Sequence, residues 1–162
     1  TTSVEMVHFI KKATPDSLQY VIKDMFETIT LYSNRIVDVS SKALDNGKYE
    51  VEIEFNVSKY RNNEKGRKYY GLKQGDTLSY QTESMKKPEL SAPLADYIDI
   101  GVFTEEEVDG KKKEKVLYLK KHKITSINNK LTIIVDEKPT EVGVDPYNKL
   151  IDTSSDDNRR EL

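Results

Sequence analysis

Apolar residues recur at helical spacing in the first 30 positions of the chain. Thr14 suits the N-cap of a helix and Pro15 its first turn, where proline's missing backbone N–H does no harm. Val4, Val7 and Phe9 indicate a shorter helix before Thr14. Beyond Pro15, intervals of three and four residues define one apolar helix face, whose members are Leu18, Val21, Ile22, Met25, Phe26 and Ile29. Such a face must be covered by another part of a protein.

From about residue 34 to 136 the pattern changes to that of antiparallel β-structure. Residues 49–57 alternate between apolar and polar side chains, as a half-buried strand does. The turn Asp45-Asn46-Gly47 before them can be a two-residue turn or a three-residue loop. Only the three-residue loop puts apolar residues opposite one another, with Gly47 in a left-handed conformation. It predicts three pairs: Val37 with Phe55, Val39 with Ile53, and Ala43 with Tyr49.

A second hairpin is predicted around Asp109-Gly110, a strong signal for a two-residue turn. Pairing outward from this turn brings acidic residues opposite lysines, and apolar residues opposite one another further along. The predicted pairs are Glu107 with Lys112, Glu106 with Lys113, Phe103 with Val116, Val102 with Leu117, Ile100 with Leu119, Asp99 with Lys120, and Tyr97 with His122.

Several short antiparallel strands favour an immunoglobulin-like β-sandwich preceded by one or two N-terminal helices. Three more segments have strand character: residues 68–72, 77–81 and 131–135. Residues 88–93, bounded by prolines, are expected to form a loop. The region after Pro139 shows no periodicity, and its end, 156–162, is expected to be frayed. We therefore expect three parts: a helical segment at 1–33 that joins an upstream domain, the β-sandwich at 34–138, and an irregular C-terminal tail at 139–162.

Composition narrows the classes of function. The 162 residues include 26 Lys and Arg against 28 Asp and Glu, a net charge of −2. Proteins that bind nucleic acid usually carry a basic excess, so this balance argues against such a partner. The absence of cysteine excludes disulfides, thiolate metal sites and a cysteine nucleophile. No apolar run approaches the roughly 18 residues that span a membrane, and a start at Thr1 indicates a piece of a longer protein.

The sequence contains few residues that could form an active site. His8 and His122 are its only histidines, and neither belongs to a His-Glu-x-x-His motif. Glu50, Glu52 and Glu54 lie on one face of a predicted strand, which favours a solvated face over paired acid–base chemistry. Residues 152–158 have the alternating oxygen side chains of a calcium loop but lack its glycine. We therefore predict no enzyme activity, no cofactor and no metal in this chain.

Three segments carry a resemblance to a known family. They are residues 14–32, residues 96–103, and residues 144–158 with Val-Asp-Pro-Tyr-Asn-Lys-Leu-Ile-Asp followed by Asp-Asp-Asn. Together they resemble the C-terminal region of bacterial membrane proteins that join an ABC-transporter permease to an aminopeptidase-N-type (gluzincin) zinc metallopeptidase. In that family the zinc ligands lie upstream, in a thermolysin-like domain, and none of them maps onto this chain.

The resemblance implies a non-catalytic accessory domain that packs on the upstream catalytic domain of the same parent chain and shapes substrate access. The apolar helix face from Leu18 to Ile29 is expected at that junction. Zinc is expected only in the parent's catalytic domain, and membrane association only through the parent. The resemblance assigns no role to residues 145–158.

An alternative is a stand-alone β-sandwich module that binds a protein, peptide or glycan through tyrosines. Tyrosine suits this role because its ring is apolar and its hydroxyl polar. An exposed cluster of three or more would favour this alternative, whereas buried rings would count against it. The candidates are Tyr60, Tyr69, Tyr70, Tyr80 and Tyr97.

Overall fold

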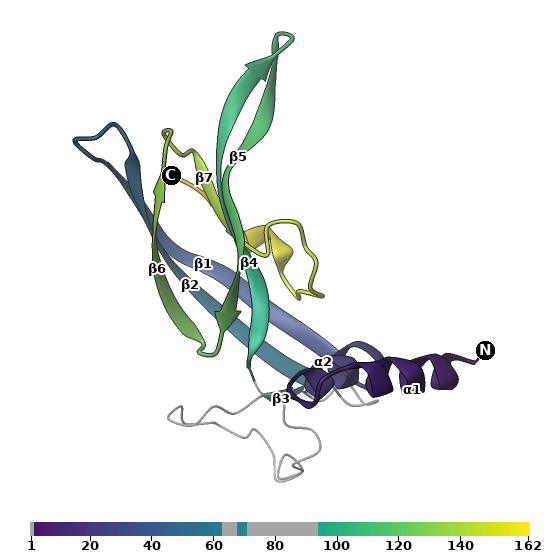
Figure 1. Ribbon diagram of the computed structural model, residues 1–162. Coiled ribbons are helices and arrows are strands. Elements are labelled where there is room, and N and C mark those ends of the chain that lie inside the picture. Colours follow the sequence, from purple (N-terminus) through teal and green to yellow (C-terminus); the bar gives the residue numbers. More distant parts are fainter. Residues whose placement is uncertain (1, 63–67, 71–93) are drawn as a thin grey trace.

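The computed structural model describes residues 2–62, 68–70 and 94–162. In these ranges two four-stranded antiparallel sheets pack against each other, and a helical segment lies at one end of them (Figure 1). The predicted β-sandwich with N-terminal helices is therefore confirmed. Two hairpin ribbons extend beyond the packed sheets at the end away from the helices.

The first helix, α1 (Ser3–Ala13), begins with a capping box. The Thr2 hydroxyl accepts a hydrogen bond from the Glu5 backbone N–H at 3.3 Å, and the Glu5 carboxylate accepts one from the Thr2 N–H at 2.8 Å. Thr14 was predicted to begin the next helix, but it ends this one. Its hydroxyl donates to the Ile10 carbonyl at 2.7 Å, so it is occupied as a C-terminal cap.

The predicted helix from Thr14 to about residue 30 forms as three short turns and ends early. A 3₁₀ turn, η1 (Asp16–Leu18), leads into α2 (Gln19–Ile22) and then into a π-helical turn, η2 (Lys23–Glu27). Ile29, assigned to the apolar helix face, instead opens a strand. The helical spacing was wrong at that point because the backbone of Ile29 pairs with the neighbouring strand.

Strands β1 (Ile29–Ala43) and β2 (Tyr49–Asn62) form the first ribbon. The three-residue loop is confirmed: the Leu44 N–H donates to the Lys48 carbonyl at 2.8 Å, and Gly47 has φ of +79°. The predicted pairs of Val39 with Ile53 and Ala43 with Tyr49 are also confirmed.

The predicted pair of Val37 with Phe55 is wrong, because a β-bulge at Val37 places Ile36 opposite Phe55. The bulge turns the Val37 carbonyl away from the ladder. That carbonyl accepts a hydrogen bond from the Arg160 guanidinium at 2.6 Å.

β2 has two further partners in this sheet. Strand β6 (Asn128–Val135) pairs with its first half and β3 (Lys68–Tyr70) with its end. The strands expected at 68–72 and 131–135 are thus present, although residues 71 and 72 lie outside the described residues. The expected strand at 77–81 and the loop at 88–93 lie outside them too.

The second sheet has the order β5-β4-β7-β8. β4 (Asp96–Val108) and β5 (Lys111–Ile124) form the second ribbon. The pairs of Glu107 with Lys112, Glu106 with Lys113 and Phe103 with Val116 are confirmed.

The four predicted pairs beyond Val116 are wrong by one residue, because Leu117 is inserted as a bulge. Leu117 packs against the core from this position. The shift places four new residues opposite β4: Tyr118 faces Val102, Lys120 faces Ile100, Lys121 faces Asp99, and Lys123 faces Tyr97.

The region expected as an irregular tail completes the second sheet. β7 (Glu141–Val144) pairs with β4, and β8 (Arg159–Glu161) pairs with β7. The prediction of a frayed end at 156–162 is therefore wrong. β7 escaped detection because it has only four residues, with Gly143 between its two valines.

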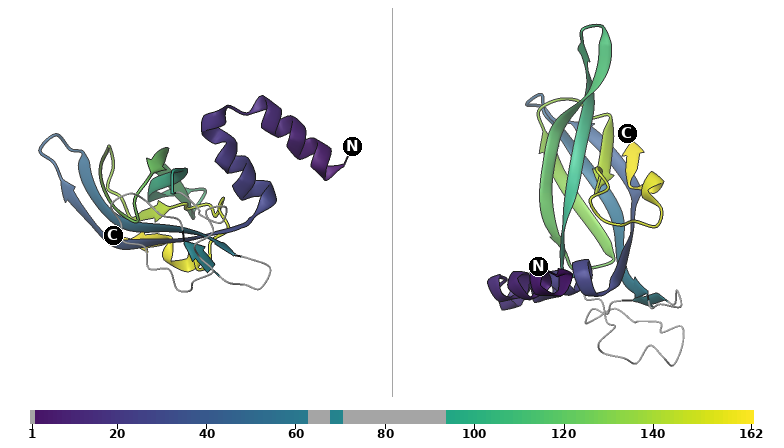
Figure 2. Two further views of the ribbon diagram at one scale, coloured as in Figure 1. Left: turned by 90° about the horizontal axis from the view of Figure 1, so that it is seen from below. Right: turned by 90° about the vertical axis from the view of Figure 1, so that its right-hand side faces the viewer.

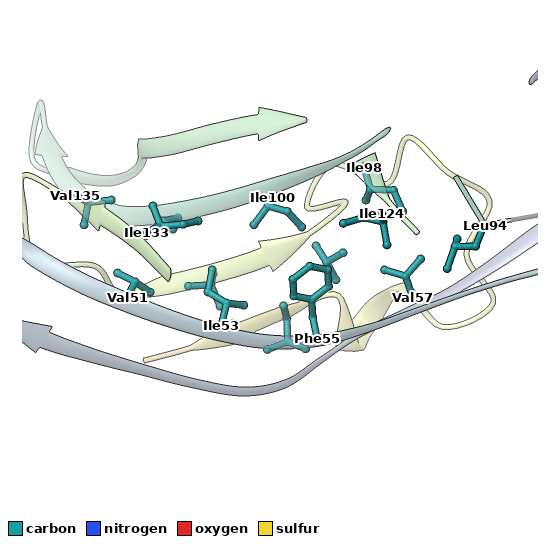
Figure 3. Close-up of a cluster of buried hydrophobic side chains, with 14 residues drawn as sticks. Val51, Ile53, Phe55, Val57, Leu94, Ile98, Ile100, Ile124, Ile133 and Val135 are labelled. Atoms are coloured by element: carbon teal, nitrogen blue, oxygen red, sulfur yellow. The ribbon is translucent and has the colours of Figure 1, made fainter. Parts of the chain in front are cut away.

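Fourteen buried apolar residues form the core between the sheets (Figure 3). β2 contributes one row of inward residues and β4 the facing row, with β6 and β7 adding two each. They are Ile36, Val51, Ile53, Phe55, Val57, Leu94, Ile98, Ile100, Val102, Ile124, Ile133, Val135, Val142 and Val144. The polar alternates on β2 face outward, so the predicted period-two burial of this strand is confirmed.

Candidate functional site

The helical segment carries a concentration of exposed apolar side chains. Val4 is 76% and Met25 67% exposed, and no residue of α1 is buried. Large exposed apolar surface on a folded domain usually marks contact with another molecule or domain. We call this set the helical surface. Its members are Val4, Met6, Phe9, Leu18, Met25 and Phe26 of the helical segment, and Ile29, with which β1 begins.

The predicted apolar face falls only partly on this surface. Ile22 is buried inside the domain and Val21 is half-buried, so neither is freely available to a partner. The other four predicted residues, Leu18, Met25, Phe26 and Ile29, are exposed. Helical spacing found these residues, but it did not show which of them the domain itself would cover.

A shallow groove lies between α1 and η2. Val4, Val7 and Phe26 line it together with polar side chains. An ion pair between Lys11 of α1 and Glu27 of η2 crosses beside it. Both members of this pair are partly exposed, so it orients the helices without closing the groove.

The helical segment is fixed to the sandwich by buried charges. Lys59 of β2 pairs with Asp24 of η2 and, at 3.0 Å, with Asp96 at the start of β4. Arg61 of β2 also binds Asp24, through its Nε at 3.0 Å and through a terminal nitrogen. The Lys59 side chain is fully buried, and the other three are at most 12% exposed. We call these four residues the ion cluster.

Two tyrosines complete the surroundings of Lys59. Its ammonium lies 5.3 Å from the ring centre of Tyr20 and 5.8 Å from that of Tyr32, within cation–π distance. The Tyr32 hydroxyl donates to Asp96 at 3.0 Å, and the Tyr20 hydroxyl donates to the Ala95 carbonyl at 2.6 Å. Burial, followed by the Asp96 charge, raises the pKa of both phenols, so both stay protonated at neutral pH.

The ion cluster is structural rather than reactive in this arrangement. A nucleophilic lysine must be reachable by its substrate, whereas the Lys59 side chain is fully buried. The sequence contains a signal for these buried charges. The alternation that buries residues 49–57 continues to Lys59 and Arg61, which places two charges on the core face of β2 and demands buried partners.

The segment after β7, to which the sequence assigned no role, closes the sandwich. The Asp145 carboxylate accepts from the backbone N–H groups of Lys149 and Leu150 at 3.1 and 2.8 Å. The Asp152 carboxylate accepts from the N–H of Asn34 on β1 and of Ser154, both at 2.9 Å. This closing segment, residues 145–158, therefore ties β1 of one sheet to β7 of the other (Figure 2).

Asp99 of β4 forms the ionic part of that closure. Its carboxylate binds Lys149 at 2.7 Å and Lys121 at 3.4 Å. Burial opposes ionisation of Asp99, but the hydrogen bonds and charges of the two lysines prevail and lower its pKa. Burial also raises the pKa of Asp145, and there it outweighs the two backbone hydrogen bonds that favour the charged form.

The two histidines lie on different elements. His8 is on α1, where its ring meets Phe9 edge-on at 5.7 Å. His122 is on β5, with its Nε2 2.7 Å from the Tyr118 hydroxyl. Burial and the nearby Lys120 lower the pKa of His122. The part of the chain that the structure describes contains no group of three His, Asp or Glu side chains that could hold a metal ion.

The glutamate row and the tyrosine candidates differ in their exposure and contacts. Glu52 and Glu54 are half-exposed and share Lys130 at 3.2 Å, which confirms the solvated face predicted for this row. Among the tyrosine candidates, Tyr60 is buried and Tyr97 is 53% exposed. The side chains of the remaining three, Tyr69, Tyr70 and Tyr80, lie outside the described residues.

Comparison with protein-family models, with curated proteins and with solved structures finds no match to this chain. Among the described residues, no helix has the length and apolar character needed to cross a membrane.

Proposed function

We propose that this chain is a non-catalytic accessory domain whose helical surface packs on a neighbouring domain. The observation that carries the proposal is the exposure of Met25, Phe26 and Ile29 next to a buried anchor. Exposed apolar groups on a loose segment would gain little by binding, because ordering the segment would offset the gain. The ion cluster holds η2 against β2, so this surface is preorganised.

The neighbouring domain that suits this surface is the catalytic domain of a zinc aminopeptidase-like parent. The resemblance of residues 14–32, 96–103 and 144–158 to permease–aminopeptidase fusion proteins supports this part of the proposal. In such a parent, zinc belongs to the catalytic domain, the membrane is reached through the permease, and this domain limits the approach of peptide substrate.

The test begins with the reading frame upstream of Thr1. If it encodes His-Glu-x-x-His, the catalytic region and this chain are produced together and separately. Amide hydrogen exchange is then measured over residues 3–29 in both preparations. We expect slower exchange at the helical surface in the joined protein, because packing excludes water from it.

Matched variants sharpen this test. Met25→Ser with Phe26→Ser should loosen the junction, whereas Ile134→Ser, at a residue 56% exposed on β6, should not. Equal exchange with and without the catalytic region would contradict the junction. Stoichiometric zinc binding or aminoacyl-substrate cleavage by this chain alone would contradict its non-catalytic role, and an unrelated upstream region would favour a stand-alone binding module.

A further inference from the structure

Strand β5 forms one edge of the second sheet. The order of that sheet is β5-β4-β7-β8, and β4 is the only described strand that pairs with β5. One row of backbone N–H and C=O groups on β5 therefore faces outward, away from β4. Such an edge is a template on which a further strand can form. The β5 edge and the helical surface share no residue, so the two can be tested separately.

This edge strand is strongly basic in a chain with a net charge of −2. Its 14 residues include seven lysines and one glutamate, so 7 − 1 gives a charge of +6 with His122 neutral. Three of the lysines, Lys112, Lys115 and Lys121, bind carboxylates of the domain. The other four contact no carboxylate of the described residues and are exposed: Lys111, Lys113, Lys120 and Lys123.

We infer that the β5 edge binds an acidic, extended peptide segment as an added strand. Like charges directly opposite each other destabilise a strand pair, so a second copy of β5 is repelled. A strand that carries Glu or Asp meets complementary charge and gains the free row of backbone hydrogen bonds. Lys120 and Lys123 are three positions apart and lie on opposite faces of β5, so carboxylates on either face of the added strand find a partner.

The surroundings of these lysines favour a peptide over single-stranded nucleic acid. Nucleic-acid surfaces of this kind stack successive bases on several exposed aromatic rings. Beside the free lysines, Tyr97 is exposed and the Lys123 ammonium lies 6.0 Å from its ring centre. The neighbouring Tyr118 is half-buried and its hydroxyl contacts His122. A second ring, Tyr147, is 43% exposed, and its hydroxyl donates to Glu114 near the other end of β5. Two separate rings suit peptide side chains better than a run of stacked bases.

The test uses the whole chain and a fluorescent synthetic peptide that alternates Glu with Val. Fluorescence anisotropy gives the dissociation constant, and amide hydrogen exchange reports protection of residues 111–124. A first control peptide replaces Glu with Lys. A second keeps the glutamates but methylates alternate backbone nitrogens, which blocks the ladder without changing the charge. We expect binding of the parent peptide alone, with slower exchange along β5 and weaker binding in high salt.

Protein variants provide the matched control. Reversing Lys113, Lys120 and Lys123 to Glu should weaken binding about tenfold or more, since each change replaces attraction by repulsion. Reversing three exposed lysines elsewhere, Lys12, Lys42 and Lys138, changes the net charge equally and should have little effect. Equal binding of the methylated peptide would overturn strand addition. Binding of a single-stranded RNA or of phosphatidylserine vesicles, but not of the peptide, would overturn the choice of partner.

Discussion

The tip of the β4–β5 ribbon and the helical end of the sandwich both pair acidic with basic residues, but in opposite surroundings. At the ribbon, Lys112 is 79% exposed and Glu105 53% exposed. In the ion cluster, Lys59 is fully buried and Asp24 is 7% exposed. Water already solvates the ribbon charges, so their contact adds little free energy. In the ion cluster, protein groups must supply the interactions with the buried charges that water would otherwise make.

This difference separates two roles of charge in one domain. The ribbon charges are solvated and pair weakly, so each can be lost singly. The ion cluster is an all-or-none arrangement, because removing one member leaves the others buried without full compensation. Its benefit is the fixed position of η2 rather than stability as such.

The largest expected effect is that of Asp24→Ala. Removing this carboxylate leaves Lys59 and Arg61 with less negative charge than they need, and a broken buried pair typically costs about 3–5 kcal/mol. Urea unfolding should show that loss in the free energy of unfolding. Asp16→Ala, at an exposed residue of η1, is the control and should leave the unfolding curve unchanged. Similar urea unfolding curves for the two variants would show that the buried ion cluster stabilises the domain no more than an exposed charge does.

A smaller loss is expected for Asp152→Ala in the closing segment. The substitution leaves the N–H groups of Asn34 and Ser154 without their acceptor, and such a loss typically costs about 1–3 kcal/mol. Asp156→Ala removes an exposed carboxylate from the same segment and provides the control. Thermal unfolding followed by circular dichroism measures both, and a larger effect at Asp156 would contradict the role given to Asp152.

Acid should remove the contribution of Asp99. Its pKa is lower in the folded domain than in the unfolded chain, so below about pH 4 the unfolded chain takes up the proton first. The stability from Asp99 is therefore complete above that pH and is lost as the pH falls through the folded pKa. Asp99→Asn should flatten the acid limb of unfolding free energy against pH. An unchanged acid limb would show that Lys149 and Lys121 do not favour the charged form.

The smallest effect is expected for Lys112→Ala at the ribbon tip. Lys112 and Glu105 are well exposed, so the melting temperature should stay within experimental error of that of the unaltered domain. A clear drop in melting temperature would mean that the exposed ribbon charges stabilise the domain. Exposure would then not explain the difference in stability between the ribbon charges and the ion cluster.

Local patterns predicted the parts of the fold that are locally determined. The alternation around Val51 and Ile53 located β2, and the turn signals located both ribbon tips. The bulges at Val37 and Leu117 could not be foreseen, because an inserted residue leaves the alternation of each flank intact and only changes its phase. Each bulge is fixed by contacts from outside its hairpin, one with Arg160 and one with the core.

The candidate site shows the same limit. Helical spacing assigned Met25 and Phe26 to one apolar face, and both side chains are exposed. It did not reveal that Asp24, between them and the sheet, would bind Lys59 from a strand 35 positions later in the chain, since 59 − 24 is 35. Pairings of this kind depend on tertiary structure, so they become visible only once the sheets are assembled.

The closing segment also sets the order in which the domain can fold. The contact of Asn34 with Asp152 joins residues 118 positions apart, so a long loop must close before it can form. Domains dominated by such distant pairings fold in milliseconds to seconds, far more slowly than helical bundles. Each β-ribbon can form early from its own turn. The contacts of the closing segment between β1 and β7 are expected to form last and to limit the folding rate.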